Sequence, residues 1–340
     1  METVLAVDLG GTTLKCAVFD ATGAPLWAAR HPTGRERGAD AVVSTVLEVL
    51  TSMRERAVAS GWPPRAIGLA VPGLVDAAAG VAVWSVNVGW RDVPLRDLVE
   101  ARVGLPTVLS NDVRAGGLAE AAASGSDDVL FVPIGTGIAS AHVVAGAVVT
   151  GASGAAGELG HVVVRPGGRK CGCGRRGCLE AEASASAIEA RYREAGDSVQ
   201  SGGSVQSGGS VQSGDSVQSG GSVPAAISAA GASAAEVARL AAAGDPVAAG
   251  VWGEAVEALA DGLVSAAALL DPRVIVVGGG LARAGETLFG PLRAAVSARG
   301  SFLPAPEIVP ATLGDEAGCH GAALLARPLL AGVSGLPAPS

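Results

Sequence analysis

Residues 3–20 read TVLAVDLGGTTLKCAVFD, and this stretch predicts how the fold begins. Apolar residues alternate on both sides of Gly10-Gly11, which indicates a strand, a tight turn and a second strand. Because glycine has no Cβ, a phosphate chain could approach the backbone of this turn closely, beside Asp8, Thr12 and Thr13. A plain hairpin without a ligand is the alternative interpretation of this motif when it is taken alone.

The stretch DVLFVPIGTGIASAHVVAGAVVTG, residues 128–151, repeats this organisation. One strand runs into the turn Gly135-Thr136-Gly137, and a second strand with a further short hairpin follows it. Two hairpins of the same kind, one near the start of each expected domain, predict an internally duplicated α/β fold. The repetition is stronger evidence than either turn alone.

The remaining sequence predicts further strands and helices. Residues 66–76 and 105–112 are apolar enough for buried strands, although residues 85–95 indicate mostly loop. Another buried strand leads into Gly278-Gly279-Gly280 and a helix start, without the G-x-G-x-x-G spacing of a dinucleotide-binding turn. Helical patterns cover residues 39–59, 95–104, 113–125, 182–196, 233–270 with a break at 244–246, and 320–332, before a frayed tail.

A cysteine cluster lies in the stretch GELGHVVVRPGGRKCGCGRRGCLE, residues 157–180. Cys171, Cys173 and Cys178 have the spacing C-x-C-x₄-C, and His161 lies ten residues upstream of the first cysteine. Three thiolates and one imidazole complete a tetrahedral ligand set, so the sequence predicts a structural Zn²⁺ site. A zinc ribbon that only fastens a loop is the simpler interpretation.

Two carboxylates, Glu158 and Glu180, bracket the cysteine cluster. If a metal folds the segment, these carboxylates come close to His161. The imidazole can then bind zinc through one ring nitrogen and donate from its other N–H to a second partner. A site for a polyhydroxylated ligand requires fixed donors and acceptors of this kind.

Asn111-Asp112 ends one predicted strand and begins a helix. A carboxylate at the carboxyl end of a strand points into the crevice where open α/β sheets bind ligands. The helix dipole favours the ionised carboxylate, which is the form that can accept a proton. Capping of the helix by these two residues is the alternative interpretation.

Composition limits the classes of protein to which the chain can belong. Its 340 residues suffice for two domains, and 49% of them are hydrophobic. The net charge of −8, with Lys15 and Lys170 as the two lysines, argues against nucleic-acid and acidic-membrane binding. We expect neither a signal peptide nor a membrane span. Three of the five cysteines belong to the cluster, and the other two, Cys16 and Cys319, are distant in sequence. A reduced cytoplasm therefore fits best.

The pattern G-E-L-G-H … C-x-C-G-x-x-G-C-L-E of residues 157–180 resembles the signature of the ROK family of sugar kinases and sugar-responsive repressors. The resemblance covers essentially the whole chain except residues 198–223. It implies a two-domain α/β protein of the actin-like ATPase (ribonuclease H-like) fold, with a sugar cleft between the domains and a zinc-bound loop. We expect a smaller domain of residues 1–117 with the returning C-terminal helix of 319–340, and a larger domain of 118–318.

The family resemblance also implies a role for each motif. Asp8 would lie near Mg²⁺ and Thr12 near the phosphates of ATP, and Asp112 would be the catalytic base. The zinc ligands would be His161, Cys171, Cys173 and Cys178. Further nucleotide contacts would come from Gly10, Gly11, Lys15, Gly135, Thr136, Gly137, Gly278, Gly279 and Gly280. The sugar would be held by Asn87, Asn111, Asp112, Glu158, His161 and Glu180.

Two details of the sequence bear on this resemblance. The loop N-x-G-W-x-x-V-P-L, which contains Asn87 and Trp90, is similar to the sugar loop of ROK glucokinases. Val113-Arg114 departs from the small or amide residues that often follow the catalytic pair in the family, whereas Glu120 matches a glutamate that is often found there. The register of the helix after Asp112 is therefore expected to be that of the family.

Together these roles imply an ATP-dependent glucokinase that phosphorylates the 6-hydroxyl of glucose. N-acetylmannosamine, fructose or allose could replace glucose, and polyphosphate could replace ATP. A sugar-responsive repressor would need a DNA-binding segment before the strand that begins at Thr3, and a non-catalytic sugar-binding protein would be expected to lose the base or the turns. Family habit suggests a homo-oligomer, either a dimer or a tetramer.

Residues 198–223 form a low-complexity repeat of four hexapeptides, SVQSGG, SVQSGG, SVQSGD and SVQSGG, followed by Ser-Val. Such a composition cannot bury a core, so we expect a flexible, solvated linker. An insertion in a surface loop costs little stability. We therefore interpret the repeat as a neutral insertion.

Overall fold

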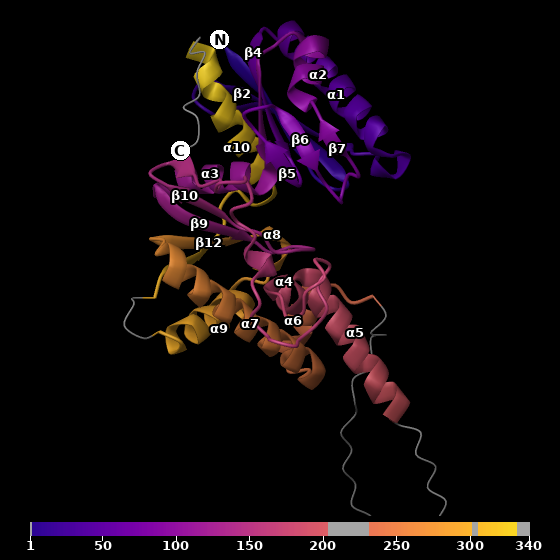
Figure 1. Ribbon diagram of the computed structural model, residues 1–340, viewed down its shortest axis with the longest axis vertical. Coiled ribbons are helices and arrows are strands. Elements are labelled where there is room, and N and C mark those ends of the chain that lie inside the picture. The colour runs from indigo at the N-terminus through magenta and orange to yellow at the C-terminus, as the bar shows by residue number, and fades with distance from the viewer. Residues whose placement is uncertain (1, 203–230, 301–304, 332–340) are drawn as a thin grey trace, which may run out of the picture.

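The computed structural model describes residues 2–202, 231–300 and 305–331. Its first five-stranded sheet has the order β3-β2-β1-β4-β8 (Figure 1). Strands β1 to β3 form an antiparallel meander, and β4 and β8 continue the sheet in parallel with β1. The bounds are β1 Thr3–Leu9, β2 Thr13–Asp20, β3 Pro25–Pro32, β4 Pro64–Val71 and β8 Thr107–Asn111.

The second five-stranded sheet has the order β11-β10-β9-β12-β13 and repeats the topology of the first. It again combines an antiparallel meander with two parallel strands. The predicted internal duplication is therefore confirmed strand by strand. The bounds are β9 Asp128–Pro133, β10 Ala141–Val144, β11 Ala147–Val148, β12 Val274–Gly278 and β13 Glu307–Pro310.

Helices cover both faces of the first sheet because its strands are apolar on both sides. Leu5 and Val7 face a core shared with α1 (Ala39–Ala59) and α2 (Leu95–Val103). Val4 and Ala6, which point the other way along β1, pack with Cys319 of α10 (Ala317–Ala326). This period-two division places a layer of helices on each face.

The second sheet is covered in the same way. Leu130 and Val132 face the largest core, which includes residues of α5 (Ala185–Gly202), α6 (Ala234–Ala242), α7 (Pro246–Leu270) and α9 (Glu286–Ala298). Val129 and Phe131 face the other side, where Ala121 of α3 (Asp112–Ser124) joins them. Each sheet thus has its own pair of helical layers.

Helices α3 and α10 pack against each other between the two sheets, and yellow α10 lies against the indigo strands in Figure 1. Their backbones touch closely, because a Cβ on Gly321 would lie 1.8 Å from the carbonyl oxygen of Ala115. Glu120 of α3 is 1% exposed and accepts hydrogen bonds from the backbone N–H groups of Thr312 and Leu313, both at 2.9 Å. The returning C-terminal helix is therefore fastened to both halves.

The smaller elements complete the structure. A three-stranded sheet consists of β5 (Leu74–Asp76), β6 (Val81–Trp84) and β7 (Arg91–Val93), so part of the predicted 85–95 loop is strand. Short helices are α4 (Leu179–Ala183), α8 (Gly279–Ala282), η1 (Arg35–Arg37), η2 (Leu159–His161), η3 (Gly314–Glu316) and η4 (Arg327–Ala331).

Several predicted boundaries differ from those in the structure. The helix expected at 182–196 is two helices, α4 and α5, and α5 runs on to Gly202, so the first five residues of the 198–223 repeat are helical where a linker was predicted. Residues 203–223 and the frayed tail lie outside the described residues. Among the residues that the structure describes, no helix is both long and apolar enough to cross a membrane.

Candidate active site

A cavity of about 720 Å³ lies where the carboxyl ends of β4 and β8 face the β9–β10 hairpin and the zinc segment, which we define as residues 157–180. Five of the six predicted sugar-binding residues line it: Asn87, Asn111, Asp112, Glu158 and His161. They come from three separate parts of the chain, and this is the size of cavity in which small molecules bind. Trp84, Ser140 and Arg175 also line it, and no pattern in the sequence singled them out.

The sequence left open whether Asn111 and Asp112 cap a helix or place a proton acceptor in the crevice, and the structure gives the two residues different positions in this respect. Asn111 is the N-cap of α3, because its Oδ1 accepts from the backbone N–H of Arg114 at 3.1 Å. Its Nδ2 donates to Asp112 Oδ1 at 3.0 Å and to the carbonyl oxygen of Gly73 at 3.0 Å. The cap therefore orients the carboxylate of Asp112, whose Oδ1 also accepts from the N–H of Val113 at 2.9 Å.

Burial, and to a smaller extent the negative charge of Asp8, raises the pKa of Asp112 to about 7. Hydrogen bonds from the backbone oppose the shift without cancelling it. A carboxylate with a pKa near the working pH is a better proton acceptor than an ordinary aspartate. Burial therefore opposes the helix dipole, which was expected to favour the ionised carboxylate.

The zinc segment brings His161 and the three cysteines together. Cys171 Sγ lies 3.6 Å from His161 Nδ1, and Cys173 Sγ lies 3.7 Å from Cys178 Sγ. All four ligand atoms lie within 4.8 Å of one another. Tetrahedral Zn²⁺ with bonds of about 2.0–2.3 Å requires separations on this scale, so the donor set fits the metal.

The second ring nitrogen of His161 faces away from the cysteines. Its Nε2 lies 3.8 Å from Glu158 Oε2, and both residues line the cavity. This is the arrangement in which one nitrogen is available to a metal and the other to a ligand. Glu158 is 65% exposed, so its carboxylate is open to a ligand that enters the cavity.

Glu180 is the predicted sugar-binding residue that does not line the cavity. Its Oε2 accepts a hydrogen bond from the backbone N–H of Ile138 at 3.0 Å, directly after the turn Gly135-Thr136-Gly137. A Cβ on Gly137 would lie 2.4 Å from the same oxygen. Glu180 therefore connects the zinc segment to the second glycine turn.

The first glycine turn carries the charged pair Asp8 and Lys15. Lys15 Nζ donates to Asp8 Oδ2 at 3.1 Å and to the carbonyl oxygen of Asp315 at 2.6 Å. Burial raises the pKa of Asp8, while the charge of Lys15 lowers it. Thr12 is exposed at the turn, where a phosphate could reach its hydroxyl.

The second glycine turn lies beside the three predicted adenosine-side glycines. Ile134 donates its backbone N–H to the carbonyl oxygen of Gly278 at 2.9 Å, and its own carbonyl accepts from Leu281 at 3.0 Å. A Cβ on Gly279, where φ is +78°, would lie 2.4 Å from the carbonyl oxygen of Ile134. Only glycine fits this approach, and Gly280 is left open to solvent.

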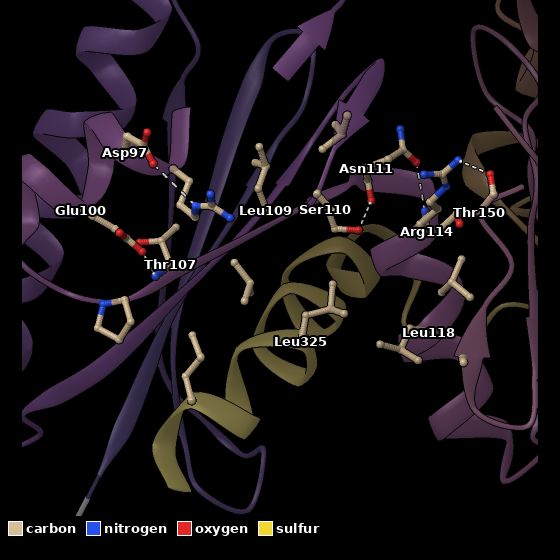
Figure 2. A pocket seen from close by; sticks show the side chains of 18 of the residues that line it. Asp97, Glu100, Thr107, Leu109, Ser110, Asn111, Arg114, Leu118, Thr150 and Leu325 are labelled. Carbon is tan, nitrogen blue, oxygen red and sulfur yellow. Dashed lines mark hydrogen bonds and ion pairs between the residues drawn. The ribbon is translucent and has the colours of Figure 1, made fainter. Parts of the chain in front are cut away.

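Arg114 forms a wall shared by the cavity described above and a second cavity of about 840 Å³ (Figure 2). The second cavity lies along β8, with Leu118 and Leu325 on its sides. Arg114 Nη2 donates to the carbonyl oxygens of Gly154, Ala156 and Thr150 at 2.6, 3.4 and 3.5 Å. The arginine that departs from the family pattern thus holds the loop before Glu158.

Trp90, which the sequence marked together with Asn87, lies in the core. Its ring is 2% exposed and packs with the cluster under α1 and α2. Its indole Nε1 has no hydrogen-bond partner among the described residues. Trp90 therefore packs the loop against the hydrophobic core, while Asn87 lines the cavity.

Comparison with known proteins identifies the family. The sequence profile of the ROK family matches residues 4–328. A glucokinase of Thermotoga maritima is 33% identical, over 97% of this chain and 98% of its own length. The structure of a ROK family glucokinase from Streptomyces griseus in complex with glucose and AMPPNP is 30% identical, with a TM-score of 0.75 over 96% of this chain and 99% of that one.

A ROK hexokinase of Thermus thermophilus is 34% identical, with a TM-score of 0.76, and covers 97% of this chain and 99% of its own. The chain belongs to the ROK family. The predicted α/β fold of the actin-like ATPase type is confirmed by these neighbours and by the two duplicated sheets.

Proposed function

We propose that this protein is an ATP-dependent glucokinase, which transfers the terminal phosphoryl group of ATP to the 6-hydroxyl of glucose. The observation that carries the proposal is the placement of Asp112 in the same cavity as Asn87, Glu158 and His161, close enough to Asp8 for their charges to interact. The names of the similar glucokinases support it.

Asp112 is the proposed catalytic base. As the oxygen of the 6-hydroxyl bonds to phosphorus, the carboxylate accepts the hydroxyl proton. A pKa of about 7 suits this late transfer better than the usual aspartate value, since it lies nearer the working pH. Asn111 keeps the carboxylate in position through its 3.0 Å hydrogen bond.

The glycine turns are the proposed nucleotide site. Asp8 is the residue that would hold Mg²⁺, with Lys15 beside it, and the metal supplies neutralisation of phosphate charge when it is bound. Gly10, Gly11 and Thr12 would line one side of the phosphates. The other side would be formed by Gly135, Thr136 and Gly137, and Gly278, Gly279 and Gly280 would face the adenosine.

The zinc segment has a proposed structural role. His161, Cys171, Cys173 and Cys178 would hold Zn²⁺, which fastens the segment when it is bound. His161 would then keep Nε2 for the sugar, together with Glu158, Asn87 and Asn111. We retain Glu180 as a proposed sugar contact, although here its carboxylate bonds to Ile138.

The domain boundaries predicted above, a homo-oligomer and a cytoplasmic location belong to the same proposal. The two sheets with their separate cores support a division into two domains. Light scattering of the purified protein would establish the number of subunits.

A coupled assay for ADP release tests the function, with Mg-ATP, a panel of hexoses and an Asp112→Asn variant. We expect turnover with glucose and a loss of about 10²–10⁴-fold in the variant, the usual contribution of a general base. Equal turnover by the variant would remove Asp112 from this role. Release of ADP with another hexose but not with glucose would reassign the substrate.

A further inference from the structure

The segment after β3 lies on the first glycine turn. Thr33 is fully buried; its backbone N–H donates to the carbonyl oxygen of Thr12 at 3.0 Å, and its hydroxyl donates to that of Gly10 at 3.1 Å. A buried residue bonded at two points leaves a segment little freedom. These bonds fix the residues that follow Thr33 relative to Gly11.

Arg35, in η1, brings its guanidinium to this turn. Its Nη1 lies 3.7 Å from the position that a Cβ on Gly11 would occupy, which is ordinary van der Waals contact. Within the described residues, no hydrogen bond or ion pair engages the Arg35 side chain. The neighbouring Arg37, by contrast, donates from Nη2 to Thr45 Oγ1 at 3.0 Å.

The charge balance at the turn calls for a second cation. A phosphate chain brings several negative charges to a place where Asp8 is already acidic. Lys15 is engaged by Asp8 and by the carbonyl oxygen of Asp315. Arg35 carries a free charge, and its planar fork can bind phosphate oxygens through two parallel hydrogen bonds.

We propose that Arg35 binds the phosphate chain of the nucleotide at the first glycine turn and is a further catalytic residue of the phosphoryl transfer. The inference rests on the proposed kinase function. Its ligand is the phosphate chain of a nucleoside triphosphate, and the adenosine end plays no part in the contact. Arg37, whose side chain donates a hydrogen bond to Thr45 of α1, has no such role.

The test measures binding and turnover in four proteins: the native chain, Arg35→Met, Arg35→Lys and the matched control Arg37→Met. Calorimetry follows the binding of Mg-AMPPNP and of adenosine, and the coupled assay gives KM for ATP, KM for glucose and kcat. Because Arg35 is exposed, we expect all four proteins to fold, and thermal unfolding checks this.

We expect Arg35→Met to bind Mg-AMPPNP about tenfold more weakly or worse, the scale of one charge-assisted hydrogen bond. Adenosine binding and KM for glucose should not change, and Arg35→Lys should recover part of the loss because it keeps the charge without the fork. A merely structural role would weaken adenosine binding as well, or would be matched by Arg37→Met.

Two results would overturn the inference. If Arg35→Met binds Mg-AMPPNP as the native chain does, Arg35 does not contact the phosphates, and the kinase function stands. If the native chain binds no Mg-AMPPNP and releases no ADP, the proposed function fails together with the inference.

Discussion

The two glycine turns share a topology but differ in where their charge comes from. The first, between β1 and β2, has Asp8 and Lys15 within its own hairpin. The second, between β9 and β10, lies between Ile134 and Ile138 and meets the carboxylate of Glu180, which lies 42 residues further along the chain than Ile138. Duplication thus accounts for the backbone of both turns. The charged groups at the first turn belong to its own hairpin, whereas the carboxylate at the second turn comes from the zinc segment.

The largest effect should follow from breaking the zinc segment, because structural zinc contributes about 10–16 kcal/mol to folding in small peptides. In Cys178→Ser, which loses a fully buried ligand, we expect glucose turnover to disappear. Hydrogen exchange should show lost protection at the N–H of Ile138 and retained protection at the N–H of Thr33.

Cys16→Ala, which changes a buried cysteine outside the cluster, is the control for this experiment. If Cys178→Ser lost hydrogen-exchange protection equally at the N–H groups of Ile138 and Thr33, the second turn would not depend on the zinc segment more than the first does. Chelation of the native protein should reproduce the effect of the variant.

Asp8→Asn tests the first turn, with a smaller expected effect. We expect kcat to fall about 10²–10³-fold, because the variant loses the proposed ligand of Mg²⁺, the ion that would neutralise the phosphate charge. The pH dependence should change as well. In the native protein, activity falls as the pH falls through the pKa of Asp112, about 7, and the charge of Asp8 is one cause of that high value.

Removing the charge of Asp8 should therefore move the acid limb of the kcat profile to lower pH. Asp20→Asn, at the far end of the same hairpin, is the control, since among the described residues its carboxylate accepts hydrogen bonds from Thr22 and Ala24 of its own turn. An unmoved acid limb in Asp8→Asn would show that burial alone sets the pKa of Asp112.

Gly137→Ala and Glu180→Ala together test the second turn. The added Cβ would lie 2.4 Å from Glu180 Oε2, so Gly137→Ala should cost about 1–3 kcal/mol of unfolding free energy. Glu180→Ala should cost about 1–2 kcal/mol, because it leaves the N–H of Ile138 without its partner.

The double variant should cost at least about 0.5 kcal/mol less than the sum, since the alanine no longer meets a carboxylate. Denaturant unfolding measures all three values. Gly135→Ala, whose Cβ would meet nothing within 4 Å, is the matched control. Additive costs would mean that Glu180 and Gly137 do not interact.

The smallest expected effect is a gain of stability in Asp112→Asn. A carboxyl group whose pKa is raised on folding destabilises the protein as it ionises, so the cost is absent below about pH 4 and complete above about pH 7. At pH 8 the isosteric amide should add about 1 kcal/mol, because the side chain is partly open to the cavity. If Asp112→Asn changed the free energy of unfolding by the same amount at pH 4 and at pH 8, the raised pKa of Asp112 would be contradicted.

Local patterns in the sequence were sufficient to predict the two glycine turns, the duplicated strands and the four residues that cluster as a possible metal site. These features depend on spacing over a few residues, and Gly10-Gly11 and the C-x-C-x₄-C run carry that information directly. Five of the six proposed sugar-binding residues line one cavity, and each of them follows a recognisable motif.

The features that sequence reasoning missed depend on distant partners. The pKa of Asp112 reflects burial and the charge of Asp8, which a linear pattern cannot show. The hydrogen bond from the N–H of Ile138 to Glu180 Oε2 joins residues 42 positions apart, which no local pattern can show. Thr33 and Arg35 belong to no motif, because they reach the first glycine turn only after β3 has paired with β2.

Helix α10 has a consequence for the order of synthesis. It covers one face of β1 and β4, although β4 ends at Val71 and α10 begins only at Ala317. At roughly 5–20 residues per second, the ribosome finishes β8 about 10–40 s before α10 emerges. During that interval the apolar face formed by Val4, Ala6 and Phe19 has no cover from its own chain, so the first half of the protein is the part for which a chaperone would matter most.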